Sequence, residues 1–255
     1  MAPRRMDPAF REKVWGSTGL SPWFPNPETK IGEVWFDGGD RLPLIKFLFT
    51  TDRLSVQVHP DDEYAREHEN SNGKTEMWHI LQASPAGRVA IGFRGAASEE
   101  EVRAAALNGT VEGMLNWIPV RPGDTLFVAA GTVHAIGAGI ALCEIQQRSD
   151  VTYRIYDYGR PRELHLDKAL AIANLGPCTG RATLPVRCPF FHTERLTLRE
   201  ELTVNPVASH SAIIALQGEG LLGGEPFFAG EVWEVPPDTS VSLRGSASLL
   251  RVFIP

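Results

Sequence analysis

Short runs of β-forming residues, separated by glycine and proline, limit most strongly what this chain can fold into. The sequence has 24 glycines and 19 prolines, spread along its length. The strand candidates between them have the spacing that is typical of β-barrels and β-sandwiches. They are KIGEVWF, LIKFLFT, LSVQVH, MWHILQA, VAIGF, TLFVAA, ALCEIQ, SAIIALQ, EVWEVP and SLLRVFIP. The pattern predicts a mainly β protein of one of these two kinds.

Helix signals are fewer. SEEEVRAAALNG has Ser98 and Glu101 at capping-box spacing and closes on Gly109, and HLDKALAIANLG ends on Gly176. From about residue 186 the alternation of short strands and glycine turns seen in the first half is repeated in a shorter segment. We therefore predict one architecture used twice, in a unit of residues 1–185 and a smaller unit of residues 186–255.

Charge and composition exclude several classes of protein. Twenty-five basic and 31 acidic side chains give a net charge of -6, so we expect no broad basic surface for nucleic acid or anionic membranes. No apolar run approaches the roughly 20 residues of a membrane span, and MAPRRMDPAFREKVW lacks the apolar core of a signal peptide. The three cysteines, Cys143, Cys178 and Cys188, form no CxxC spacing, which favours a reduced, cytoplasmic protein.

The stretch LSVQVH, residues 54–59, alternates strictly between apolar and polar side chains. In an extended strand, Ser55, Gln57 and His59 share one face, and the leucine and two valines share the other. We predict that the polar face points into the barrel, where metal, water or sugar hydroxyls satisfy it, and that the apolar face packs outward.

Two histidines and a carboxylate form the first candidate site. His59, Glu76 and His134, with the amide oxygen of Gln57 as a possible fourth ligand, suit a borderline divalent ion, with Zn²⁺ foremost. Each could instead be an ordinary strand residue. His79 has the opposite strand parity to Glu76, so we expect it to point away from this site.

Charged residues in apolar surroundings form the second candidate feature. Lys46, inside PLIKFLF, requires either an anionic partner or a route to solvent, and its spacing leaves both open. Glu144, Gln146, Asp150 and Arg154 share strand parity. As a charge cluster alone, this group is also typical of a surface salt-bridge network.

Seven blocks together resemble the type I mannose-6-phosphate isomerases (phosphomannose isomerases) of the cupin superfamily, in their short bacterial form. They are WG at 15–16, PLIKFL, LSVQVHPDDEYA, GKTEMWHIL, GDTLFVAAGTVHAIG, EIQQRSDVTYRIYDYGR and RELHLDKAL. The resemblance covers roughly residues 14–175. The remainder is similar only in its pattern of strands and turns. It implies a double cupin, meaning two jelly-roll-like β-barrels with a few short helices. It also implies one zinc ion in the first barrel and no metal site in the second. Ala129 stands where the cupin motif usually has proline, so we expect a slightly altered turn with its ligand retained.

The same resemblance implies residue roles. The metal ligands are Gln57, His59, Glu76 and His134; the catalytic residues are Lys74, Glu144, Asp150 and Arg154; and the substrate-binding residues are Lys46, Ser55, Lys74 and Arg154. Asp150 is the first candidate for the proton-transferring base and Glu144 the second. The implied reaction is zinc-dependent interconversion of mannose 6-phosphate and fructose 6-phosphate through an enediol. The implied partner is a small sugar phosphate, without nucleic acid or membrane, bound by a monomer or homodimer.

Other functions stay open at this stage. A non-catalytic, metal-containing cupin that binds a sugar or sugar phosphate would use much of the same site. The two-histidine, one-carboxylate set could also hold Fe²⁺ in a cupin oxygenase, or serve a different sugar-phosphate isomerase. A purely structural β protein would leave the polar strand face and Lys46 unexplained.

Overall fold

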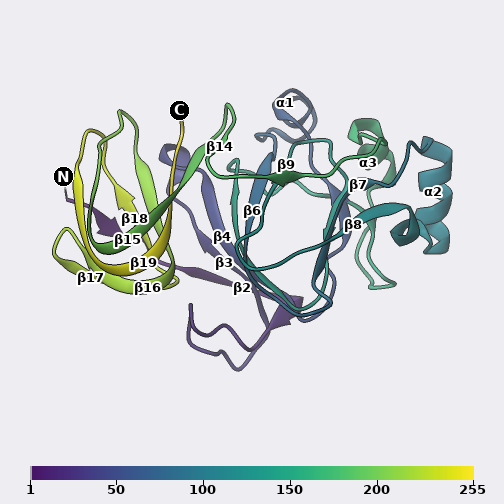
Figure 1. The fold of residues 1–255 in the computed structure, drawn as a ribbon. Coiled ribbons are helices and arrows are strands. Elements are labelled where there is room, and N and C mark those ends of the chain that lie inside the picture. The colour runs from purple at the N-terminus through teal and green to yellow at the C-terminus, as the bar shows by residue number, and fades with distance from the viewer. Residues whose placement is uncertain (1) are drawn as a thin grey trace.

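The computed structural model describes residues 2–255, whose strands form three β-sheets (Figure 1). Two sheets enclose the barrel of the N-terminal part. The first has seven strands in the order β13 (Arg181–Ala182), β9 (Thr125–Val128), β6 (Glu76–Ala83), β11 (Ile140–Gln146), β4 (Leu44–Phe49), β3 (Ile31–Phe36) and β2 (Ala9–Ser17). The second has five strands in the order β12 (Tyr153–Tyr156), β5 (Val56–Val58), β10 (His134–Ile136), β7 (Arg88–Phe93) and β8 (Leu115–Pro119). The predicted mainly β, cupin-like fold is confirmed.

The third sheet forms the C-terminal part and curls on itself, at the left of Figure 1. Its strand order is β1 (Arg4–Arg5), β18 (Val232–Val235), β16 (Ser211–Leu222), β19 (Val241–Phe253), β15 (His192–Val204) and β14 (Val186–Arg187), with β17 (Glu225–Phe228) paired to β16. This sheet takes in a strand from each end of the described chain. The predicted division at residues 185 and 186 stays a prediction.

Helices lie at the periphery of the barrel. They are α1 (Asp62–Glu69), α2 (Glu99–Asn108) and α3 (Leu166–Ile172), with 3-10 turns η1 (Gly39–Arg41) and η2 (Val111–Met114). Helices α2 and α3 lie at the end of the molecule away from the C-terminal sheet (Figure 1). No helix among residues 2–255 combines the length and the apolar character that a bilayer crossing needs.

The capping-box prediction is confirmed, whereas one helix was not predicted and the end of another differs from the sequence pattern. Ser98 and Glu101 exchange both capping bonds, and Gly109 closes α2 in the left-handed conformation. The pattern did not predict α1, because this short helix buries only Ala65 and so lacks an apolar stripe. Helix α3 ends at Ile172 and not near Gly176, because the backbone of Asn174 turns away to pair with the 131–132 turn.

Strand β4 is buried on both faces, and its side chains alternate between two different surroundings. Ile45, Phe47 and Phe49 belong to a core shared with C-terminal residues such as Ile214 and Leu250. The residues between them face the barrel interior, because side chains alternate across a strand. This is why a lysine can stand inside the apolar run of β4 and still lie within the barrel.

The barrel interior is apolar in one half and polar in the other. Leu48, Trp78, Ile91 and Leu142 belong to the apolar cluster inside the barrel. Outside the five-stranded sheet, the valines of β5 pack with residues of α2 and α3. The predicted outward orientation is therefore confirmed for Val56 and Val58. It is wrong for Leu54, which precedes β5 and packs in the apolar cluster inside the barrel.

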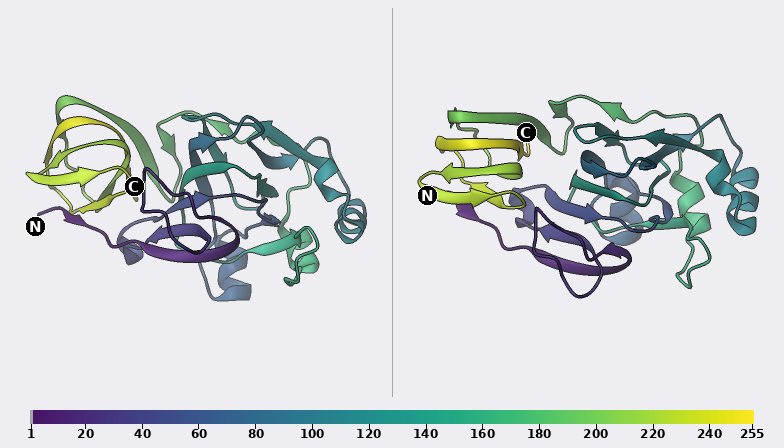
Figure 2. Two further views of the ribbon diagram at one scale, coloured as in Figure 1. Left: turned by 90° about the horizontal axis from the view of Figure 1, so that it is seen from below. Right: turned by 60° about the horizontal axis from the view of Figure 1, so that its bottom comes forward.

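An ion-pair cluster attaches the N-terminal segment to the C-terminal sheet. The buried carboxylate of Glu234, on β18, lies 2.6 Å from Arg4 Nη2, 2.9 Å from Arg41 Nε and 3.0 Å from His210 Nδ1. Burial would raise the pKa of Glu234, but hydrogen bonds from Arg41 and Arg4 lower it below its usual value. Figure 2 shows that both chain ends lie beside this sheet.

Candidate active site

Strand register brings the polar residues of the barrel together. In the five-stranded sheet, His134 is opposite Gln57, and Gln57 is opposite Arg154. His59 follows β5 directly, and Glu76 opens β6 on the facing sheet. Directly opposite residues in antiparallel strands project to the same side of a sheet, so this row faces the barrel interior.

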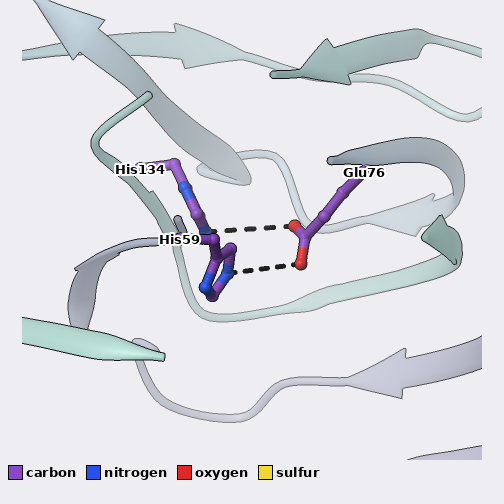
Figure 3. Close-up of side chains that lie close together, drawn as sticks. All are labelled: His59, Glu76 and His134. Carbon is purple, nitrogen blue, oxygen red and sulfur yellow. Dashed lines mark ion pairs between the residues drawn. The ribbon is translucent and has the colours of Figure 1, made fainter. Parts of the chain in front are cut away.

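His59, Glu76 and His134 form a compact buried cluster (Figure 3). Each is about 1% exposed, and one ligand atom from each lies within 4.8 Å of the others. His59 Nε2 lies 3.3 Å from Glu76 Oε1, and His134 Nε2 lies 3.9 Å from Glu76 Oε2. The predicted grouping of these three residues is present in the structure.

Hydrogen bonds to the outer ring nitrogens fix how the two imidazoles face the carboxylate. His59 Nδ1 contacts the Val151 carbonyl at 2.9 Å, and His134 Nδ1 contacts the Thr132 carbonyl at 2.9 Å. A carbonyl oxygen can only accept, so each Nδ1 donates and, in the neutral ring, each Nε2 keeps a lone pair. Burial first, and then the charge of Lys74, lowers the pKa of His59 to about 3.

The cluster fits a metal ion on its own geometry. His59 Nε2 and Glu76 Oε1 are buried and have no hydrogen-bond partner. Buried polar atoms are normally satisfied, and metal-binding histidines characteristically donate their other nitrogen to a carbonyl or carboxylate. Two imidazole nitrogens and a carboxylate oxygen are ligands for a borderline divalent ion.

Gln57 lies beside the cluster with its amide turned the other way. Its Nε2 is 3.2 Å from His134 Nε2, and its Oε1 accepts a hydrogen bond of 3.1 Å from Ser55 Oγ. A half-turn of the amide would aim the oxygen at the cluster, and the Ser55 hydroxyl can bond to either end. Gln57 thus lies next to the cluster, and Ser55 lies next to Gln57.

Buried lysines balance the carboxylates. Lys74 Nζ lies 3.2 Å from Glu76 Oε1. Burial acts to lower the pKa of Lys74, but the charges of Glu76, Glu144 and Asp150 together raise it above its usual value. Lys74 is therefore a cation inside the barrel at neutral pH.

Lys46 has an anionic partner, which is one of the two alternatives that its sequence context left open. Its Nζ lies 3.5 Å from Glu144 Oε2 and 4.3 Å from the centre of the Trp35 ring. Trp78 Nε1 donates a 2.9 Å hydrogen bond to Glu144 Oε1. Burial, followed by the nearby charge of Glu76, raises the pKa of Glu144 to about 7, although Lys46 opposes the shift.

A cavity of about 260 Å³ lies next to the cluster. Gln57 and Lys74 line it and also contact the cluster. Its charged lining comprises five basic and three acidic side chains, which are Lys13, Lys46, Lys74, Arg154, Arg162, Glu33, Glu144 and Asp150. The excess of positive charge suits an anionic ligand.

Asp150 lines this cavity from a loop, and Arg154 lines it from a strand. Asp150 is exposed on the loop between β11 and β12, whereas Arg154 is half-buried on β12. Arg154 Nη1 donates to the Glu163 carbonyl at 2.8 Å, and its buried Nε has no partner. His165, at the start of α3, contacts the backbone nitrogen of Arg154 through Nδ1.

Sequence reasoning missed three charged residues of the cavity lining. Arg162 is held by Asp157, with Nη2 donating to Oδ1 at 2.6 Å. Lys13 Nζ lies 3.3 Å from Glu33 Oε2. Two signals were available: Arg162 stands in the block RELHLDKAL, and Glu33 interrupts the apolar run KIGEVWF.

Comparison with known proteins identifies the family. No protein-family model matches the chain. The mannose-6-phosphate isomerase ManA of Bacillus subtilis is 31% identical over 293 aligned residues, covering 92% of this chain and 93% of ManA. The chain belongs to the mannose-6-phosphate isomerase family. The mannose-6-phosphate isomerase of Streptococcus mutans is 37% identical over 69% of this chain, which spans 61% of that protein.

Solved structures agree with this membership of the mannose-6-phosphate isomerase family. The crystal structure of the mannose 6-phosphate isomerase from Bacillus subtilis matches over the full length of both chains, with a TM-score of 0.90 and 28% identity. A putative mannosephosphate isomerase from Archaeoglobus fulgidus, at 17% identity and a TM-score of 0.84, shares the fold. The resemblance inferred from the seven sequence blocks is confirmed.

In this member of the mannose-6-phosphate isomerase family, His79 lies outside the His59, Glu76 and His134 cluster, as its strand parity predicts. It is buried, and its Nδ1 lies 2.9 Å from Thr125 Oγ1. Burial, and then the charge of Arg195, lowers the pKa of His79 from 6.5 to about 4. The folded state therefore favours the neutral ring.

This shift predicts a pH dependence of stability. Below pH 6.5 the unfolded chain gains a proton on this histidine that the folded chain resists, so stability is lost as the pH falls toward 4. We expect the His79→Gln variant to lose roughly 1–2 kcal/mol less than the wild type between pH 7 and pH 5. Urea unfolding at both pH values measures this difference, with exposed His68→Gln as the control. Equal losses in the wild type and His79→Gln would contradict the assignment.

Proposed function

We propose that this protein is a zinc-dependent aldose-ketose isomerase that interconverts mannose 6-phosphate and fructose 6-phosphate through an enediol. The observation that carries the proposal is the buried His59, Glu76 and His134 cluster beside a cavity with excess positive charge. Membership in the family of ManA, a protein named for this activity, supports the choice of substrate.

The metal site we propose uses the nitrogens of His59 and His134, the Glu76 carboxylate and the Gln57 amide oxygen. Bound there, Zn²⁺ would supply a Lewis acid for a sugar oxygen. The two imidazole nitrogens that are turned toward the Glu76 carboxylate support this ligand set.

Isomerisation must move a proton between C2 and C1 of the sugar, which requires a base close to those carbons. We propose Glu144 for this step, ahead of Asp150. Glu144 is buried in the cavity wall and its pKa of about 7 suits proton exchange near neutral pH, whereas Asp150 is exposed. Lys46 and Trp78 hold the Glu144 carboxylate in place.

The cationic side chains would bind the substrate and its developing charge. Lys74, next to Glu76, would stabilise negative charge on the sugar oxygens. Arg154 has an unpartnered Nε that is available to an anion such as phosphate. Arg162, although paired with Asp157, adds positive charge to the same cavity. We propose hydrogen bonding from Ser55 and charge pairing from Lys46 as further substrate contacts.

The test is a coupled assay of fructose 6-phosphate formed from mannose 6-phosphate. Metal-stripped protein should be inactive, and equimolar Zn²⁺ should restore turnover, while Mg²⁺ serves as the control for a non-specific effect of divalent ions. Failure of every metal-restored sample would refute the isomerase proposal. Restoration by Fe²⁺ and not by Zn²⁺ would refute the choice of metal.

A further inference from the structure

The loop of residues 147–152, between β11 and β12, touches the site at two points. Its Val151 carbonyl accepts the hydrogen bond from His59 Nδ1, at 2.9 Å. Its Asp150 side chain lines the adjacent cavity. One short segment therefore both orients a candidate metal ligand and supplies an acidic side chain to the cavity.

Gln146, the last residue of β11, fastens this loop from the barrel side. Its side chain is fully buried, and Nε2 donates to the Gln147 carbonyl at 2.9 Å and to the Ser149 carbonyl at 2.6 Å. Gln146 is the cross-strand partner of Glu76, so the two side chains leave the same face of the sheet. Its Oε1 has no hydrogen-bond partner.

The outer side of the loop has a separate anchor in Gln147. The Gln147 backbone nitrogen donates to the Thr75 carbonyl at 3.1 Å, and its Oε1 accepts from the Thr75 nitrogen at 2.9 Å. Gln147 Nε2 also donates to Asp62 Oδ1 at 2.7 Å. Because these bonds lead to the segment before Glu76 and to α1, the loop is held from outside independently of Gln146.

We infer that Gln146 is a positioning residue, whose amide holds the 147–152 loop so that the Val151 carbonyl keeps His59 turned toward Glu76. The catalytic part of this inference rests on the proposed function. A side chain that cannot donate would release the two loop carbonyls, and the Val151 carbonyl would lose its fixed position beside His59. Mutation of a group that orients a metal ligand typically lowers metal affinity by roughly 10–100-fold.

The experiment compares the wild type with Gln146→Met, which keeps a long unbranched side chain but removes both donors. We expect the zinc Kd of the metal-stripped protein, measured by competition with a chromophoric chelator, to rise about tenfold or more. We also expect faster amide hydrogen exchange in the peptide containing residues 147–152. In the zinc-saturated enzyme, kcat should fall while KM for mannose 6-phosphate stays nearly constant, since the loop orients groups and leaves the cationic lining intact.

Gln82→Met is the matched control, because Gln82 is an exposed glutamine on β6. It should leave zinc Kd and loop exchange unchanged. A folded Gln146→Met variant with wild-type zinc Kd and wild-type exchange would overturn the inference. If Gln146→Met does not fold, Gln146→Asn, whose amide is one methylene too short to reach both carbonyls, decides by the same two measurements. An inactive wild type would refute the proposed isomerase, and the zinc and exchange data would still decide the role of Gln146.

Discussion

The His134→Ala variant should lose its bound zinc and at least about 100-fold of its isomerase activity. His134 supplies one of three buried ligand atoms, and a methyl side chain leaves the Glu76 carboxylate with one imidazole neighbour. Metal content after dialysis against a weak chelator, together with the coupled assay at saturating mannose 6-phosphate, measures both effects. The activity loss follows because a Lewis acid typically contributes several kcal/mol to stabilising charge in the transition state.

His68→Ala provides the matched control, since His68 is exposed on α1 and lies outside the cluster. It should retain zinc and turnover. Full activity in a zinc-free His134→Ala protein would show that isomerisation does not depend on the metal. Zinc binding equal to that of the wild type would remove His134 from the ligand set.

The Glu144→Gln variant should lose roughly 10²–10⁴-fold in kcat and keep its zinc. Glutamine preserves the size of the side chain and can still accept from Trp78 Nε1, but it cannot take a proton from the sugar carbon. Asp150→Asn should lose much less turnover, because Asp150 is exposed at the edge of the cavity. Steady-state kinetics of both variants, with zinc content measured in parallel, distinguish the two carboxylates.

The opposite order of effects would assign proton transfer to Asp150, the first candidate under the resemblance. A small effect of both substitutions would exclude both as the proton-transferring group. Loss of zinc in Glu144→Gln would show that this carboxylate supports the metal site, in which case its kcat could not be assigned to proton transfer.

Strand periodicity was sufficient to predict much of the candidate metal site. Alternation in LSVQVH placed Gln57 and His59 on the inner face, and parity in β6 separated Glu76 from His79. These predictions hold because side-chain direction in a strand is set by local backbone geometry. The resemblance to the isomerase family supplied Lys74, which periodicity did not single out, and a role for Arg154, which strand parity placed only in a charge cluster.

Features that depend on tertiary contacts were less accessible. Arg162 reaches the cavity because Asp157 holds its guanidinium, and Glu33 lies there because β3 pairs with β4. The block RELHLDKAL and the interrupted run KIGEVWF mark these residues in the sequence, but only the folded contacts place them at the cavity. Likewise, the end of α3 depends on Asn174 pairing with a turn about 40 residues earlier in the chain, and the order of the two candidate bases depends on how deeply each is buried.

The strand at Arg4–Arg5 has a consequence for the kinetics of folding. Arg4 pairs with Glu234 across 230 residues of chain, on one edge of the C-terminal sheet. Closing so long a loop is entropically costly, and contacts between distant segments slow folding. During refolding, this edge should be among the last structures to form, and until then β18 presents unpaired backbone groups to other chains. The N-terminal strand thus protects the protein against edge-to-edge aggregation once folding is complete.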